Sequence, residues 1–304
     1  MPGTSPPRTL ALVIASRGNP QTLQATITES LKGAVLECTK VVVGLDEDDP
    51  SLQAALSGLA SFPEKANVKV ALGPRPDAIG SVYNRCVSQE PADIYVNGAD
   101  DVIIRTVGWD ATIVDATAKV PDFIGVVGFG TMPVPSALPV MCAVTRPLIE
   151  RMGYFLQPFT PYWWMDTWLF EITHLIGRMI PVDLDVECLE WKKTRGMREL
   201  TYWATFYDDM RPHRRAIAEA IIKDPEFMTT DAFKQELLER MDRLCDTFNR
   251  ANSGLRDPAH AAKIMGEFAH DAPADERYLR VKARSVELVK SLATGPASTG
   301  PIRP

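Results

Sequence analysis

The first half of the chain contains short apolar runs that end abruptly in polar or acidic residues. The runs at 9–16, 40–45 and 93–97 read TLALVIAS, KVVVGL and DIYVN, and they are followed by RGNP, DEDDP and GADD. A fourth run, VKVAL, lies at 68–72. These runs are apolar on both sides, so each predicted strand is expected to be buried on both faces. Such strands indicate a mostly parallel sheet that is covered by helices.

Segments with helical signals separate the predicted strands. Asn19 and Pro20 are residue types preferred at a helix cap and at the first helical position. The other expected elements are helices at 78–89, 108–120, 146–153 and 162–177, strands at 122–129 and 140–145, and a proline-rich loop at 130–139. This alternation predicts an α/β fold with a Rossmann-like sheet flanked by helices.

The pattern changes after Trp191, because only helical signals occur from about 199 to 293. We therefore expect a sheet domain at 9–198 and an all-helical C-terminal region at 199–293. The polar, proline-containing ends at 1–8 and 294–304 are expected to be disordered.

Composition limits the location of the protein. No apolar run approaches the ~18 residues that a membrane span needs, and the first residues lack the pattern of a signal peptide. The five cysteines are scattered without a CxxC pair, which favours free thiols over a disulfide framework or a zinc site. We expect a cytoplasmic protein without a membrane span, in the host cytoplasm if a phage encodes it.

The net charge of −6 excludes a strongly basic nucleic-acid binder. Two local basic segments, KKTRGMR at 192–198 and RPHRR at 211–215, are exceptions. Each is interpreted as a solvated helix face or, alternatively, as a surface that contacts phosphates.

The adjacent acids Asp100 and Asp101 follow the strand expected at 93–97 after two small residues, Gly98 and Ala99. Ligands of parallel sheets bind at the carboxyl ends of the strands, and Mg²⁺ or Mn²⁺ is often held by one or two carboxylates together with substrate phosphates. The alternative is an acidic turn or helix cap, since aspartate is common in both.

Five motifs occur one after another along the first two thirds of the chain. They are ALVIASRGNP, VVVGLDEDDPSL, SVYNRCVSQEPADIYVNGADDVIIRTVGWD, LPVMCAVTRPLIERMGYF and WWMDTWLFE. Together they resemble GT-A fold glycosyltransferases of the family-2 kind over roughly residues 9–210. The phage and metavirome members, TET-associated glycosyltransferases of hydroxymethylpyrimidines in DNA, carry similar SRGRP, DDDDP, DD…GWD and D..W motifs.

The resemblance implies a nucleotide-sugar site at the carboxyl edge of the sheet. Ser16 and Arg17 would line the nucleotide site, and Asp46 would contact the base or ribose of the donor. Asn84 matches an asparagine near the donor in the family. Asp100 would contribute to donor and metal binding.

The resemblance also implies a metal and a catalytic base. Asp101, together with Asp100, stands where the family binds Mn²⁺ or Mg²⁺, and Asp166 matches the base of inverting members. Family members often complete the metal site with a histidine, which the segment DVECLEWKK lacks. Glu187 or Glu190 could replace it, or acids and phosphate alone could hold the metal.

The implied reaction is inverting transfer of a hexose from a donor such as UDP-glucose to a hydroxyl group, with 5-hydroxymethylcytosine in DNA as one candidate acceptor. Saccharide, lipid-linked and protein hydroxyls are the other candidates, and an inactive nucleotide-binding protein is the alternative function. Trp163, Trp164 and Trp168 are expected in the core, and the alternative is that their rings stack on a sugar or a base. The enzyme interpretation requires Asp46, Asp101 and Asp166 to meet at one cleft.

Overall fold

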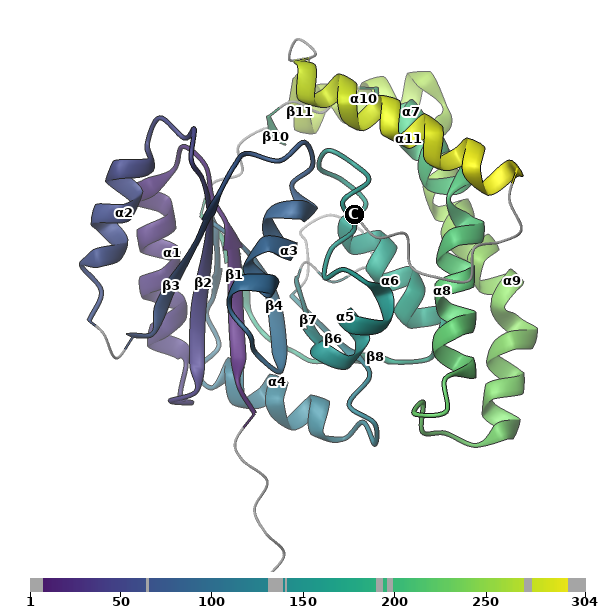
Figure 1. Cartoon of the computed structure of the whole chain (residues 1–304), viewed down its shortest axis with the longest axis horizontal. Coiled ribbons are helices and arrows are strands. Elements are labelled where there is room, and N and C mark those ends of the chain that lie inside the picture. The colour runs from purple at the N-terminus through teal and green to yellow at the C-terminus, as the bar shows by residue number, and fades with distance from the viewer. Residues whose placement is uncertain are drawn as a thin grey trace, which may run out of the picture. The chain divides into compact units, whose positions relative to one another are not determined.

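The computed structural model describes residues 8–63, 66–130, 139, 141–189, 194–195, 199–270 and 275–294 (Figure 1). It contains two compact units. The first comprises Met1–Arg75, Val82–Glu150 and Met179–Glu190, and the second comprises Pro76–Ser81, Arg151–Arg178 and Trp191–Pro304. The expected disordered ends and the loop at 130–139 fall almost entirely outside the described residues, and the expected domain boundary at 198 stays a prediction.

The first unit is built on a seven-stranded sheet with the order β3-β2-β1-β4-β7-β6-β8. Its strands are β1 (Leu10–Ala15), β2 (Thr39–Asp46), β3 (Val68–Gly73), β4 (Ile94–Ala99), β6 (Val126–Phe129), β7 (Met141–Thr145) and β8 (Met179–Pro181). β7 is antiparallel to both β4 and β6, whereas the remaining pairs are parallel. The predicted α/β fold with a mostly parallel sheet is confirmed.

The helices of this unit alternate with the strands. They are α1 (Pro20–Gly33), α2 (Leu52–Ala60), α3 (Gly80–Gln89, in this unit from Val82), α4 (Trp109–Ala118) and α5 (Arg146–Met152, in this unit to Glu150). A separate pair of short strands is formed by β5 (Val102–Ile104) and β9 (Val186–Cys188). The sequence pattern missed α2, β5, β8 and β9, because segments this short carry little periodicity.

Both faces of β2 are covered, as its continuous apolar run predicts. Val41 and Val43 belong to the core that includes residues of α1 and α2, and Figure 1 shows these two helices side by side. On the opposite face, a Cβ atom on Gly44 would lie 2.4 Å from Val82 Cγ1 of α3. Only glycine therefore lets α3 approach β2 this closely.

The parallel register places the carboxyl ends of the central strands together. Ala15 at the end of β1 lies opposite Gly44 of β2 on one side and Ala99 of β4 on the other. The residues that follow Ala15 and Ala99 are Ser16 and Asp100, so the register brings two predicted site residues to the same edge.

The GWD motif has a structural role at the start of α4. The buried Trp109 ring donates from Nε1 to the carbonyl oxygen of Ser30 over 3.0 Å. Asp110 is also fully buried, and its Oδ2 accepts hydrogen bonds from Thr39 Oγ1 at 2.7 Å and from the Leu36 amide at 2.8 Å. This carboxylate joins α4 to the connection between α1 and β2.

The second unit consists mainly of helices. They are α6 (Met165–Leu175), α7 (Leu200–Asp209), α8 (Arg211–Lys223), α9 (Asp231–Ser253), the 3₁₀ helix η2 (Gly254–Arg256), α10 (Pro258–Phe268) and α11 (Glu276–Thr294). α6 packs against α8 and α9, which lie side by side in Figure 1. The expectation of helices alone from 199 to 293 is wrong at β11 (Ala269–His270), which pairs with β10 (Thr194–Arg195).

Among the residues that the structure describes, no helix combines the length and the apolar character needed to cross a bilayer. All five cysteines are free.

Candidate functional site

Asp100 lies at the end of β4, where side chains that follow β1 hold its carboxylate. Ser16 Oγ donates to Asp100 Oδ2 over 2.7 Å, and Asn19 Nδ2 donates to the same oxygen over 3.2 Å. Asn19 is at the cap position of α1, as predicted, but its side chain makes no capping hydrogen bond. Burial raises the pKa of Asp100, while the hydrogen bonds from Ser16 and Asn19 oppose that rise.

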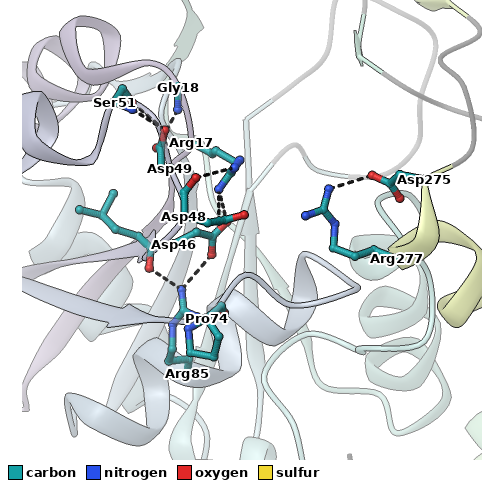
Figure 2. Close-up of polar contacts among 11 residues, drawn as sticks. Arg17, Gly18, Asp46, Asp48, Asp49, Ser51, Pro74, Arg85, Asp275 and Arg277 are labelled. Carbon is teal, nitrogen blue, oxygen red and sulfur yellow. Dashed lines mark hydrogen bonds and ion pairs between the residues drawn. The ribbon is translucent and has the colours of Figure 1, made fainter.

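Asp46 ends β2 and lies between two arginines (Figure 2). Arg17 Nη1 is 3.4 Å from Asp46 Oδ2, and Arg85 Nη2 is 3.2 Å from Asp46 Oδ1. Only 6% of Asp46 is exposed. A buried carboxylate is destabilising unless it is paired, and the two guanidinium groups supply that pairing for Asp46.

The two arginines differ in how they are held. Arg85 donates to the carbonyl oxygens of Leu45 at 2.7 Å and Pro74 at 2.8 Å, so backbone groups hold it. Arg17 instead pairs with the more exposed Asp48, with 2.6 Å between Nη1 and Oδ1. Arg85 therefore approaches Asp46 from α3, and Arg17 approaches it from the loop after β1 (Figure 2).

The loop after β2 is also tied to the loop after β1. The Gly18 amide donates to Asp49 Oδ2 over 3.0 Å, and both the amide and Oγ of Ser51 donate to Asp49 Oδ1 over 2.9 Å (Figure 2). Gly18 has a φ of +78°, a left-handed conformation that glycine adopts without strain. The SRGNP and DEDDP segments thus form one hydrogen-bonded edge.

Asn84 is half-buried on α3, between two residues that sequence reasoning missed. One is Arg85, and the other is Tyr83, whose Oη donates to the carbonyl oxygen of Gly98 over 2.6 Å. Burial raises the pKa of Tyr83, and the nearby carboxylates of Asp100 and Asp101 act in the same direction. The one sequence feature that points to Arg85 is its position next to Asn84, the asparagine that the resemblance places near the donor.

Asp101 lies in the turn between β4 and β5, and its carbonyl oxygen accepts a hydrogen bond of 2.7 Å from the Leu189 amide. Burial raises the pKa of the Cys188 thiol, and the negative charge of Asp101 contributes to this rise. Asp101 is therefore close to the end of β9, which lies in the segment DVECLEWKK that contains Glu187 and Glu190.

Asp100 and Asp101 are the candidate metal ligands at this edge. Within the described part of the chain, no group of three or more His, Cys, Asp or Glu residues is placed to hold one. Glu187 instead pairs with Arg105, with 2.6 Å between Oε2 and Nη2, and Glu190 lies outside the described residues. Asp100 and Asp101 remain as adjacent hard-oxygen donors. This set fits Mg²⁺ or Mn²⁺ that takes its other ligands from substrate phosphates and water.

Asp166 lies in the first turn of α6, in the second unit. Its Oδ1 accepts a hydrogen bond of 2.7 Å from the Thr167 amide. Burial raises the pKa of Asp166, while the hydrogen bonds from the Thr167 amide and hydroxyl oppose that rise. Because Asp46 and Asp101 belong to the first unit, the expected convergence of the three aspartates stays a prediction.

The basic segment at 211–215 is a solvated helix face only in part, and its three arginines are all paired with acids. Arg214 is fully buried and pairs with Glu171 at 2.5 Å, and His213 is also buried. Arg211 pairs with Asp246, and Arg215 pairs with Glu219 and Asp242. The segment at 192–198 lies outside the described residues except for the backbone of β10.

The tryptophans before and within α6 belong largely to the core, as expected. Trp164 and Trp168 are 5% and 1% exposed, whereas Trp163 is only partly buried and lies beside Trp164, with 6.0 Å between the ring centroids. His174 is exposed, and its Nδ1 contacts the carbonyl oxygen of Phe170 at 2.9 Å.

Solved structures with the same fold include two that cover nearly the whole chain. A mannosyltransferase from Pyrobaculum calidifontis, in complex with GDP-Man and Mn²⁺, is 15% identical with a TM-score of 0.54, and the match covers 97% of this chain and 83% of the other. TarS 1–349 from S. aureus, in complex with UDP-GlcNAc, is 11% identical with a TM-score of 0.54, and the match covers 92% and 81%.

No protein-family model and no curated protein sequence matches the chain. At these identities the likeness concerns the fold, which is the mixed α/β architecture with a helical C-terminal part. The chain therefore has the GT-A glycosyltransferase fold.

Proposed function

We propose that the protein is a glycosyltransferase that uses a nucleotide-sugar donor. The observation that carries the proposal is the carboxyl edge of the sheet, where Asp46 is held by two arginines and Asp100 by Ser16 and Asn19. Ligands of open α/β sheets bind at this edge. The mannosyltransferase with GDP-Man and TarS with UDP-GlcNAc have the same fold, and both complexes contain nucleotide sugars.

Different residues at the carboxyl edge of the sheet bind different parts of the donor. Asp46, held between Arg17 and Arg85, accepts hydrogen bonds from the base or ribose of the nucleotide. Ser16 and Arg17 line the same nucleotide site, with Asn84 on α3 nearby. Arg17 approaches this site from the loop after β1, with its guanidinium paired to Asp46 and Asp48.

A divalent cation is part of the proposal. Asp100 and Asp101, together with the acids of the DEDDP segment, make this edge acidic, so it repels a diphosphate unless a cation is present. Mn²⁺ or Mg²⁺ bound by Asp101 and Asp100 would neutralise the charge that develops on the leaving diphosphate. The mannosyltransferase structure contains Mn²⁺.

The proposed chemistry is inverting transfer of a hexose, such as the glucose of UDP-glucose. Asp166 accepts the proton of the acceptor hydroxyl as its oxygen attacks the anomeric carbon, and the nucleoside diphosphate leaves from the opposite face of the sugar. The raised pKa of Asp166 supports this role, because a base is most effective when its pKa is near the working pH.

The test is to measure release of nucleoside diphosphate from a panel of nucleotide sugars, with Mn²⁺ and with a chelator. We expect slow hydrolysis of one donor that depends on the metal. Asp166→Asn should abolish transfer while leaving donor affinity unchanged, with Asp115→Asn on the exposed face of α4 as the control. Full transfer by Asp166→Asn would contradict the base assignment.

The acceptor we propose first is the hydroxyl of 5-hydroxymethylcytosine in DNA, on the resemblance of the motifs alone. A duplex base must leave the stack to reach an active site, and phosphate contacts make such binding weaken steeply with salt. Because the arginines of 211–215 are paired, those contacts would have to come from elsewhere on the protein.

The acceptor test is to incubate the protein with the donor and either hydroxymethylated or plain DNA, and then to weigh the digested nucleosides. A hexose mass shift in the hydroxymethylated DNA alone supports a DNA acceptor. If both DNA samples are unchanged while the donor is hydrolysed, the acceptor is instead a saccharide, lipid-linked or protein hydroxyl.

An inactive nucleotide-binding protein is the second candidate function. The observation that favours it is that the described residues offer no third metal ligand beside Asp100 and Asp101. Donor binding without release of nucleoside diphosphate, with any sugar and with either metal, would support this candidate over the transferase.

A further inference from the structure

A buried ion pair joins α6 to the C-terminal helices. Glu171 of α6 and Arg214 of α8 are both 0% exposed, with 2.5 Å between Glu171 Oε2 and Arg214 Nε. Tyr207 of α7 donates from Oη to the same carboxylate oxygen. We call these three residues, Glu171, Tyr207 and Arg214, the α6 lock.

The arginine of the lock is fixed in direction as well as in charge. Arg214 Nη1 donates to the carbonyl oxygen of Tyr207 over 2.5 Å. Its guanidinium lies over the ring of Tyr207 at 3.8 Å and over the ring of Trp168 at 4.8 Å. Hydrogen bonds at the edge of the guanidinium and aromatic rings against its flat face leave Arg214 little freedom. Because Glu171 and Trp168 belong to α6, these contacts hold α6 in one rotational position.

The same tyrosine also contacts the residue at the cap of α6. Trp164 has a φ of +64°, which is unusual for a large side chain. Its buried ring is stacked with the ring of Tyr207, with 6.4 Å between centroids and 29° between planes. Asp166 follows Trp164 by two residues, so Tyr207 contacts the chain immediately before the proposed base.

The lock is not the arrangement that stability alone favours. Glu171 Oε1, Arg214 Nη2 and His213 Nε2 are buried without a hydrogen-bond partner among the described residues. Unsatisfied buried groups destabilise a fold, and a buried ion pair can often be replaced by apolar residues without loss of stability. The hydrogen bonds from Tyr207 and Arg214 nevertheless fix the rotation of α6 and therefore which side of it faces α7 and α8.

That rotation determines the direction of the proposed base. Glu171 follows Asp166 by five positions, which separates the two side chains by about 140° around the helix axis. Holding Glu171 on the buried side therefore sets where Asp166 points. We propose that Tyr207 and Arg214 are positioning residues for Asp166, and that the C-terminal helices thereby contribute to catalysis; this rests on the proposed transferase function.

The experiment compares two Tyr→Phe substitutions on the same helix. Tyr207→Phe removes only the hydroxyl that donates to Glu171 and keeps the ring, while Arg214 still neutralises the carboxylate. The matched control, Tyr202→Phe, removes a hydroxyl that lies 2.6 Å from Ser285 Oγ of α11 and does not touch α6. Both variants are measured for donor hydrolysis and for amide hydrogen exchange of α6.

We expect Tyr207→Phe to lower kcat by at least about tenfold, since a small displacement of a catalytic group can reduce a rate by as much as about a hundredfold. The donor KM should change by less than about twofold, because the donor edge keeps its contacts. Amides of the first turns of α6 should exchange faster than in the wild type. Tyr202→Phe should leave kcat and α6 exchange at wild-type values.

Equal effects of the two substitutions, or a wild-type kcat in Tyr207→Phe, would overturn the proposal. A wild-type protein that releases no nucleoside diphosphate from any donor contradicts the proposed function instead. Hydrogen exchange still decides on the lock in that case: faster exchange of α6 in Tyr207→Phe alone supports it, and identical exchange in both variants overturns it.

Discussion

Ser16 and Asp100 are joined by a hydrogen bond of 2.7 Å that links the end of β1 to the end of β4. The two residues are 84 positions apart in the sequence, and the parallel register of the two strands places them together. The bond orients one oxygen of Asp100 toward the protein. It therefore restricts the directions in which this carboxylate can bind a cation.

Asp100→Asn should weaken metal-dependent donor binding by about tenfold or more, because the amide loses the negative charge that a hard cation requires. Isothermal titration of the donor with and without Mn²⁺ measures this effect. Asp115→Asn, on the exposed face of α4, is the control. Equal donor affinity in the Asp100 variant and the control would exclude a metal role for Asp100.

Arg85→Met should destabilise the first unit by about 2 kcal/mol, because it leaves buried Asp46 with one cationic partner and removes donors from two carbonyl groups. The donor KM should also rise, since Asp46 loses its fixed orientation. Urea unfolding and steady-state kinetics measure the two effects. Arg243→Met on the exposed side of α9 should change neither quantity.

The rate of transfer should fall as the pH is lowered through the pKa of Asp166. Burial raises this pKa above its usual value of about 4, so the loss should begin at a higher pH than for an exposed aspartate. Below this pKa the carboxyl group is protonated and cannot accept the hydroxyl proton. A pH profile of kcat at saturating donor tests this, and a flat profile down to about pH 4 would exclude Asp166 as the base.

Asp166→Asn should make the protein more stable at neutral pH. The raised pKa means that folding favours the neutral form of Asp166, so its stabilising contribution is complete below the unfolded pKa of about 4 and is lost as the pH rises through the folded pKa. Asparagine is neutral throughout. The gain in unfolding free energy should therefore be present at pH 7 and should shrink near pH 4, as chemical denaturation at the two values can show.

Gly44→Ala should destabilise the protein by about 1–3 kcal/mol through overpacking between β2 and α3. The new methyl group would lie 2.4 Å from Val82 Cγ1 and 2.9 Å from Cys86 Sγ. Val82→Ala in the same chain should restore part of the loss, because it removes the nearer clash. Strictly additive effects of the two substitutions would indicate that β2 and α3 are not in contact.

The sheet could be predicted because its strands are buried on both faces. The run at 40–45 became β2 with buried residues throughout Val41–Asp46, and the acids after it reached the expected edge. The partners of these acids could not be predicted. Arg85 meets Asp46 only through the packing of α3 on β2, a tertiary contact that leaves no local pattern.

The residues that follow the basic segment at 211–215 carry a pattern that indicates the burial of Arg214. The buried residues Ile217, Ala218 and Ile221 of α8 have helical spacing, and extending their stripe toward the N-terminus reaches Arg214. Likewise, Glu171 is three residues after the buried Trp168 on α6. Two opposite charges within apolar stripes indicate a buried pair, but which helices meet is decided by the fold.

The position of β1 between β2 and β4 also affects the order in which the protein folds during synthesis. A nascent chain that ends before β4 has only one of the two neighbours of β1, so the edge that carries Ser16 lacks Asp100 until that strand emerges from the ribosome. α6 emerges later still, and its Glu171 lacks hydrogen-bond partners until Tyr207 and Arg214 have been synthesised. Truncated chains should therefore gain donor binding before they gain transfer activity. The donor edge is complete once β4 has formed, whereas α6 is held in position only after α7 and α8 have been made.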